Sequence, residues 1–256
     1  MDNYRIILLC EDNFDNMMTG IYDAWVLMNK GEDVALYVGE PFDFNLFCEY
    51  RYVVTDSLKA EKVALSIEKK ISREVYQAVY SAAMHFEPER ADVIFRFLQV
   101  GYKMGADVLN HLTNPYAMKI LELSRKVGNE EQRLRGFIRF TEINGGVLFS
   151  KISPKCNILT MVGDHFSNRY PMENWIIYDT NRKTSAIHRA GEGWSLVLNE
   201  EIDSAILSQA ENQGEYEKLW KVFFETIGIE SRKNYRCQRT MLPKWYRNNM
   251  IEFGKN

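Results

Sequence analysis

The sequence predicts an α+β fold in which antiparallel β-hairpins pack against several helices, with a helical N-terminal half. Apolar residues recur at helical spacing through most of the first half of the chain. Two pairs of short apolar segments in the second half are each separated by turn-forming residues. With 46% of its 256 residues hydrophobic, the chain can also bury a sizeable core.

The N-terminal half is expected to begin with a strand, because residues 4–10 are apolar and partly β-branched. A helix with Gly31 as its C-cap and a second strand over residues 34–38 follow. Further helices are expected over residues 57–86, 88–101 and 114–127. Residues 130–134 are polar and are interpreted as a link.

The pattern changes to strands at Arg135. Residues 135–143 and 147–153 are predicted strands, and the Asn144-Gly145-Gly146 turn between them supplies the positive φ angles of a tight hairpin. A helix from Asn157 to about residue 170 and a second hairpin, with strands over 175–179 and 183–189, are expected next. A final helix is expected over residues 201–227.

Residues 1–256 are expected to form a single body, because the joining segment near residue 131 is short and the helices before it are too apolar to stand alone. No segment approaches the roughly 20 apolar residues that a bilayer requires. The four cysteines are scattered, which favours free thiols over disulfides or a metal site. We therefore expect a cytoplasmic protein that holds no metal and does not associate with membranes.

Positive charge is concentrated near the carboxyl end. Residues 231–247 hold six basic residues and no acidic one, although the whole chain has a net charge of −3. If this stretch is helical, Arg232, Arg236 and Arg239 share a stripe, and Trp245 adds an aromatic ring. Such a surface suits phosphate neutralisation and base stacking, although it could equally pair with acidic residues of the same chain.

Two clusters could carry chemistry. Asp164 and His165 could form a general base, with Arg169 on the same helical face, but His165 also fits the edge of an apolar stripe. Asp179 could orient a water while Arg182 grips a phosphate, but the pattern favours an Asx-type turn with a surface ion pair.

Arg135 and Arg139 alternate along their predicted strand and share a face with Phe137. That face could bind nucleic acid, or a helix could cover it. Phosphate-cradling glycine loops, the G-x-S-x-G and H-E-x-x-H motifs and the zinc-deaminase signature are missing from the sequence.

These residues also carry a family resemblance. The motifs are RGFIRF at 135–140, GVLF at 146–149, D-H-F-x-x-R-Y at 164–170, W-I-I-Y-D-x-x-R at 175–182, and Arg232, Asn234, Gln238, Met241, Pro243, Trp245 and Tyr246. In this combination the chain resembles a bacterial DNA repair or DNA metabolism family that accompanies a radical-SAM partner protein. A related domain of unknown function is fused to uracil-DNA glycosylase in some bacteria.

The resemblance is densest over about residues 85–250, which leaves residues 1–84 as a more loosely similar N-terminal part. It implies work on nucleic-acid lesions beside a radical-SAM protein and assigns no catalytic residue. An iron–sulfur cluster and S-adenosylmethionine are then expected only in the partner, and no cofactor in this chain.

Three functions stay open at this point. The first is an accessory protein that binds DNA for its radical-SAM partner. The second is a metal-independent enzyme, hydrolase or glycosylase-like, whose pocket would unite the two acidic clusters. The third is a pure protein-interaction module.

Overall fold

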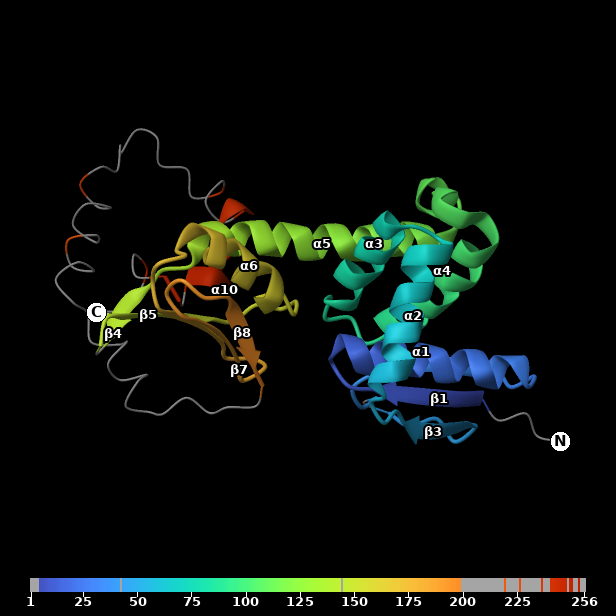
Figure 1. The fold of residues 1–256 in the computed structure, drawn as a ribbon. Coiled ribbons are helices and arrows are strands. Elements are labelled where there is room, and N and C mark those ends of the chain that lie inside the picture. The colour runs from blue at the N-terminus through green and yellow to red at the C-terminus, as the bar shows by residue number, and fades with distance from the viewer. Residues whose placement is uncertain are drawn as a thin grey trace. The chain divides into compact units, whose positions relative to one another are not determined.

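The computed structural model describes residues 5–41, 43–143 and 145–198, and after them only 219, 226, 236, 240–247, 249–250 and 253. The chain divides into two compact units, residues 1–128 and 129–256, and each is described by itself (Figure 1). The α+β class is confirmed. The expectation of a single body stays a prediction.

The first unit contains a three-stranded parallel sheet in the order β2-β1-β3. Its strands are β1 (Arg5–Cys10), β2 (Val34–Val38) and β3 (Cys48–Tyr52), and α1 (Phe14–Asn29) connects the first two. Four of the six residues of the central strand β1 are buried, as its unbroken apolar run predicts. The sequence predicted β1 and β2 but not β3.

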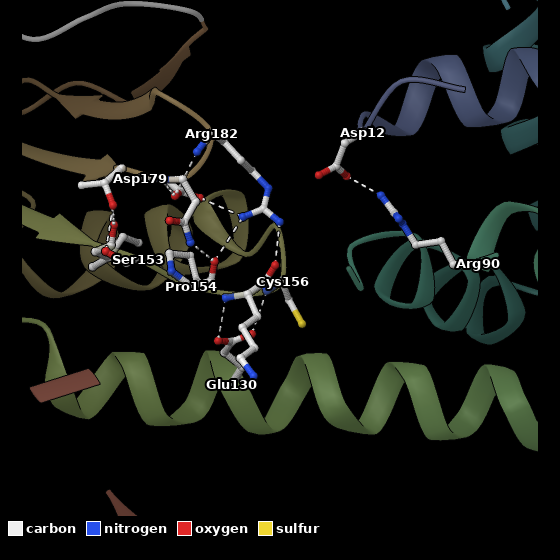
Figure 2. A network of polar contacts seen from close by, with 12 residues as sticks. Asp12, Arg90, Glu130, Ser153, Pro154, Cys156, Asp179 and Arg182 are labelled. Carbon is white, nitrogen blue, oxygen red and sulfur yellow. Dashed lines mark hydrogen bonds and ion pairs between the residues drawn. The ribbon is translucent and has the colours of Figure 1, made fainter. Parts of the chain in front are cut away.

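Polar side chains fix the loop that follows β1. Asn13 caps α1 by accepting a hydrogen bond from the Asn16 amide at 2.7 Å. The side chain of Asn16 is fully buried and donates to the carbonyl of Val53 at 2.9 Å. Arg90, which is 2% exposed, forms an ion pair with Asp12 in the same loop (Figure 2).

Helices form the rest of the first unit. They are α2 (Ser57–Lys70), α3 (Arg73–Ala83), α4 (Arg90–Met104), the short 3-10 helix η1 (Gly105–Asn110) and the first part of α5 (Pro115–Phe137). The single helix expected over residues 57–86 is wrong. The hydroxyl of Ser72 accepts a hydrogen bond from the Val75 amide at 3.1 Å, so Ser72 caps a new helix there.

The link expected at residues 130–134 and the strand expected from Arg135 are also wrong, because α5 continues to Phe137. Leu134 is buried and extends the apolar face of α5. Glu130 interrupts that face in sequence but is itself buried, because backbone amides satisfy its carboxylate.

The second unit contains a five-stranded sheet in the order β4-β5-β6-β7-β8. Its strands are β4 (Thr141–Ile143), β5 (Val147–Ile152), β6 (Trp175–Asp179), β7 (Thr184–His188) and β8 (Trp194–Val197). The pair β5–β6 is parallel, and the other neighbours are antiparallel. The second predicted hairpin is confirmed, and the first is confirmed only over residues 141–143 and 147–152. Strand β8 was not predicted.

Helix α6 (Leu159–Arg169) connects β5 to β6 and packs on the sheet. It begins at Leu159 without a side-chain cap, so the cap expected at Asn157 is wrong. Gly163 lets the ring of Trp194 lie against the helix, because a Cβ there would be 3.0 Å from the ring. The helix expected over residues 201–227 lies almost wholly outside the described residues, and no described helix is long and apolar enough to cross a membrane.

Candidate nucleic-acid interface

A side chain of α5 holds the loop between β5 and α6. The carboxylate of Glu130 accepts hydrogen bonds from the backbone amides of Lys155 at 2.9 Å and Cys156 at 2.8 Å (Figure 2). It also accepts a hydrogen bond from the hydroxyl group of Tyr246, with 3.1 Å between the two oxygens. Burial and the neighbouring carboxylate of Glu130 raise the pKa of Tyr246, so its hydroxyl stays a donor. One buried acid thus fixes two consecutive amides of the loop.

The β6–β7 turn holds the same loop from the other side. The carboxylate of Asp179 is fully buried, accepts the Asn181 amide at 2.9 Å and forms an ion pair with Arg182 at 3.2 Å. Arg182 also donates to the carbonyl of Lys155 at 2.7 Å (Figure 2). Burial raises the pKa of Asp179 despite the opposing charge of Arg182. The guanidinium is turned into the protein, as in the alternative interpretation of an Asx-type turn with an ion pair.

The short helix α10 (Lys244–Arg247) places an aromatic residue beside this loop. Tyr246 packs against Phe137 with ring centroids 5.5 Å apart, which fixes α10 on α5. The adjacent Trp245 is 41% exposed, and the ammonium group of Lys155 lies 4.6 Å from its ring centroid. The network therefore presents a cation and an indole ring together at the surface.

A second group of basic residues lies where α5 meets α6. Burial lowers the pKa of His165 most, the positive charges of Arg135 and Arg169 lower it further, and the charge of Glu131 opposes them. His165 is therefore neutral at physiological pH. Arg169 also lies over the ring of Tyr170, 5.6 Å from its centroid. We call Arg135, His165, Arg169 and Tyr170 the α5–α6 basic cluster.

This cluster differs from the arrangement that the sequence predicted. Arg135 lies on the last turn of α5 and forms an i,i+4 ion pair with Glu131. Arg139 lies between α5 and β4 and donates to the carbonyl of Gly136 at 2.7 Å. The shared strand face of Arg135, Phe137 and Arg139 is not formed, because the helix continues through Phe137.

The structure does not bring the two acidic clusters into one pocket. The carboxylate of Asp164 accepts a hydrogen bond from the indole of Trp194 at 2.8 Å, and Trp194 is in register with His188 and Trp175. Asp179 lies four residues beyond Trp175 on β6, which corresponds to about 13 Å along the strand at ~3.3 Å per residue. No described contact joins Asp164 or His165 to Asp179, so the pocket that the enzyme hypothesis requires is not formed by these residues.

The basic stretch near the carboxyl end is only partly described. Arg232 and Arg239 lie outside the described residues, and Arg236 is an exposed residue in helical conformation. Arg247 donates to the carbonyl of Leu242 at 3.3 Å and lies over the ring of Phe253. Whether these arginines share one stripe stays a prediction.

Several residues of the interface escaped the sequence reasoning. Glu130, Lys155 and Tyr246 organise the loop, although Tyr246 belongs to the quoted family motifs and could have been found from them. Glu130 gave no signal beyond a polar residue at a position that would be apolar in a continued helix. Among the described residues, no group of three His, Cys, Asp or Glu side chains could hold a metal ion.

Comparison with known proteins gives one family match. The family DUF4130, described as a domain of unknown function, matches residues 88–252. No curated protein matches the chain.

The solved structures that are distantly similar to the chain include a RecJ protein and a DHH domain. RecJ from Thermus thermophilus, in complex with Mn2+, is 9% identical, with 82% of this chain and 52% of that chain covered and a TM-score of 0.35. The DHH domain of a protein described as a member of a ribosomal protein family is 11% identical, with 73% of this chain and 74% of that chain covered and a TM-score of 0.27. The chain thus spans about half the length of RecJ, and likenesses this weak do not bear on the interface.

Proposed function

The chain belongs to the DUF4130 family, and from this premise we propose that it binds nucleic acid through residues 129–256 as an accessory protein in DNA repair or modification. The radical-SAM partner would supply the chemistry, with its own iron–sulfur cluster and S-adenosylmethionine. This chain would hold the substrate.

The α5–α6 basic cluster is the observation that carries the proposal. Arg135 and Arg169 are exposed, and Arg169 forms no ion pair among the residues that the structure describes. Both positive charges lower the pKa of His165, so the two guanidinium groups lie near the same side chain. The ring of Tyr170 adds an aromatic surface beside the guanidinium group.

The Lys155–Trp245 pair supports the same proposal by a different contact. An exposed indole stacks on bases irrespective of their sequence, and the neighbouring ammonium neutralises phosphate. Because the network around Glu130 fixes the loop and α10, these groups lose little conformational freedom on binding. They favour single strands, in which bases are open to stacking.

A salt titration tests the proposal. We expect the purified protein to bind DNA with an affinity that falls as salt rises, and Arg135→Ala with Arg169→Ala to reduce the slope of log K against log salt. Each lost phosphate contact lowers that slope by about 0.9 for duplex or about 0.7 for single-stranded DNA. Lys30→Gln is the control, because Lys30 is also exposed but lies in the first unit.

The aromatic contact has a distinct signature. We expect Trp245→Ala to weaken binding of single strands by about 1–3 kcal/mol while leaving the salt slope unchanged. Lys155→Gln should lower the slope. Alanine at Arg232, Arg236 and Arg239 should lower both the affinity and the slope. Absent or salt-insensitive binding to duplex, single-stranded and lesion-bearing DNA would contradict the proposal.

The partner requires a separate measurement. We expect the chain to co-purify with the radical-SAM protein, and expect the complex to bind DNA more tightly than either protein alone. Co-purification that survives alanine at all the basic sites, without any DNA binding, would instead favour a pure interaction module.

A further inference from the structure

The two edges of the parallel sheet in the first unit differ in whether their outward-facing backbone groups are hydrogen-bonded. On the β2 edge, the amide of Val38 donates to the carbonyl of Pro88 at 2.8 Å, and Arg96 donates to the carbonyl of Val34 at 2.5 Å. Residues in and just before α4 thus satisfy the outward-facing backbone of β2. In the described part of the chain, the β3 edge has no such cover, and β1 is its only hydrogen-bonded neighbour (Figure 1).

The free backbone groups of β3 can be identified from the register. The amide of Val53 donates to the carbonyl of Leu9 at 2.9 Å, so it points toward β1. Because the backbone groups of successive residues in a strand alternate in direction, those of Tyr50 and Tyr52 point away from the sheet. An uncovered row of donors and acceptors of this kind is a template for pairing with another strand.

Exposed apolar side chains surround this edge. Four of them are between 59% and 89% exposed, namely Phe44, Leu46, Phe47 and Val54. Phe44 contacts the ring of Tyr50 edge-on at 4.8 Å, and the hydroxyl of Tyr50 accepts the Asn45 amide at 2.8 Å, so this segment is held beside the strand. Apolar residues gathered along a bare edge are typical of an interface.

The charges on β3 identify the occupant. Glu49 and Arg51 lie on one face of the strand and form a bidentate ion pair, with N–O distances of 2.7 and 3.0 Å. If two copies of β3 meet antiparallel about a two-fold axis at Tyr50, Glu49 of each copy lies opposite Arg51 of the other. The same axis places Tyr50 of one copy opposite Tyr50 of the other. The two residues can form a hydrogen-bonded pair, because the amide and carbonyl of Tyr50 point outward. Backbone and charge therefore agree on one register.

We propose that β3 pairs with β3 of a second copy of this chain, so that two three-stranded sheets join into one sheet of six strands in a symmetric dimer. The interface is isologous, because the same residues meet on both sides. The apolar side chains that flank the edge are then buried against the second copy. The proposal is independent of nucleic-acid binding.

A charge swap tests the register. Analytical ultracentrifugation over a concentration series should detect a dimer of the full chain. Glu49→Arg and Arg51→Glu alone each place like charges opposite one another and should weaken the dimer roughly tenfold. The double variant restores the opposite-charge pairs and should return the dissociation constant to near the wild-type value. Lys69→Glu reverses a charge at an exposed position on α2 and should leave the dissociation constant unchanged.

Hydrogen exchange locates the contact independently of the variants. The amides of Tyr50 and Tyr52 should become protected as the protein concentration rises through the dissociation constant. A protein that stays monomeric at the highest soluble concentration would overturn the proposal. So would a dimer that ignores the charge swap or leaves the Tyr50 amide unprotected.

Discussion

Replacing Glu130 with alanine tests whether one buried carboxylate organises the second unit. Glu130 is 6% exposed and accepts three hydrogen bonds, from the amides of Lys155 and Cys156 and from the hydroxyl of Tyr246. Alanine leaves all three donors without that acceptor. We expect the free energy of unfolding to fall, and the β5–α6 loop to lose its fixed position.

The size of the loss follows from the burial of each donor. A hydrogen bond to a charged group contributes about 1.5–3 kcal/mol, and a donor left buried without a partner loses all of it. Cys156 and Tyr246 are 2% and 4% exposed, so water cannot replace the carboxylate there. Lys155 is exposed, and water can satisfy its amide in part. Two fully lost bonds amount to about 3–6 kcal/mol, and the partial loss at Lys155 adds to this figure.

The neighbouring glutamate provides a matched control. Glu131 lies on the same helix, and its carboxylate pairs with the exposed guanidinium of Arg135. Glu131→Ala changes the helix propensity equally but should cost only about 0–1 kcal/mol. Urea denaturation followed by circular dichroism measures both variants. A loss for Glu130→Ala below about 1 kcal/mol, or no larger than that for Glu131→Ala, would refute the reasoning.

Three further predictions concern the same unit. Burial raises the pKa of Asp179, so the contribution of this residue to the free energy of unfolding should fall as the pH rises above about 4. Asp179→Asn should remove that slope in a denaturation series, and an unchanged slope would contradict the assignment. Burial also raises the pKa of Tyr246, so stability should fall as the pH rises above about 10, where the unfolded chain ionises first. Tyr246→Phe should reduce this alkaline loss, and a loss as large as that of the wild type would point to other groups. Gly163→Ala brings a methyl group to 3.0 Å from the ring of Trp194, which should cost about 1–3 kcal/mol and alter the fluorescence of that residue. A variant with wild-type stability and emission would mean that the helix can move away.

The elements that the sequence predicted well are those specified by local signals. β1 is a continuous apolar run, and the Gly145-Gly146 turn requires positive φ angles, which it has. β3 was missed because Glu49 and Arg51 break its apolar character, as suits a strand with an open edge. β8 was missed because it is only four residues long and directly follows the glycines at 191 and 193.

The candidate interface was harder to predict because its organising contacts are distant in sequence. The bonds of Glu130 reach residues 26 and 116 positions away, and nothing in residues 130–134 signals them. Without those partners, a glutamate on an otherwise apolar face reads as a break in the helix. The strand expected from Arg135 rested on the apolar residues of 135–143 and the turn after them, and the helix that continues to Phe137 removes the strand face of arginines.

Burial also decides which of the predicted charges remain for a ligand. Asp179 and Arg182 suit both a phosphate grip and an internal ion pair by residue type. The structure directs Arg182 to Asp179 and to the carbonyl of Lys155, whereas Arg169 stays exposed beside Tyr170. Nucleic-acid affinity should therefore scale with the basic side chains that stay exposed, and not with the number of basic residues in the sequence. Arg182→Ala should accordingly cost stability far more than it changes the salt slope, while Arg169→Ala should do the reverse.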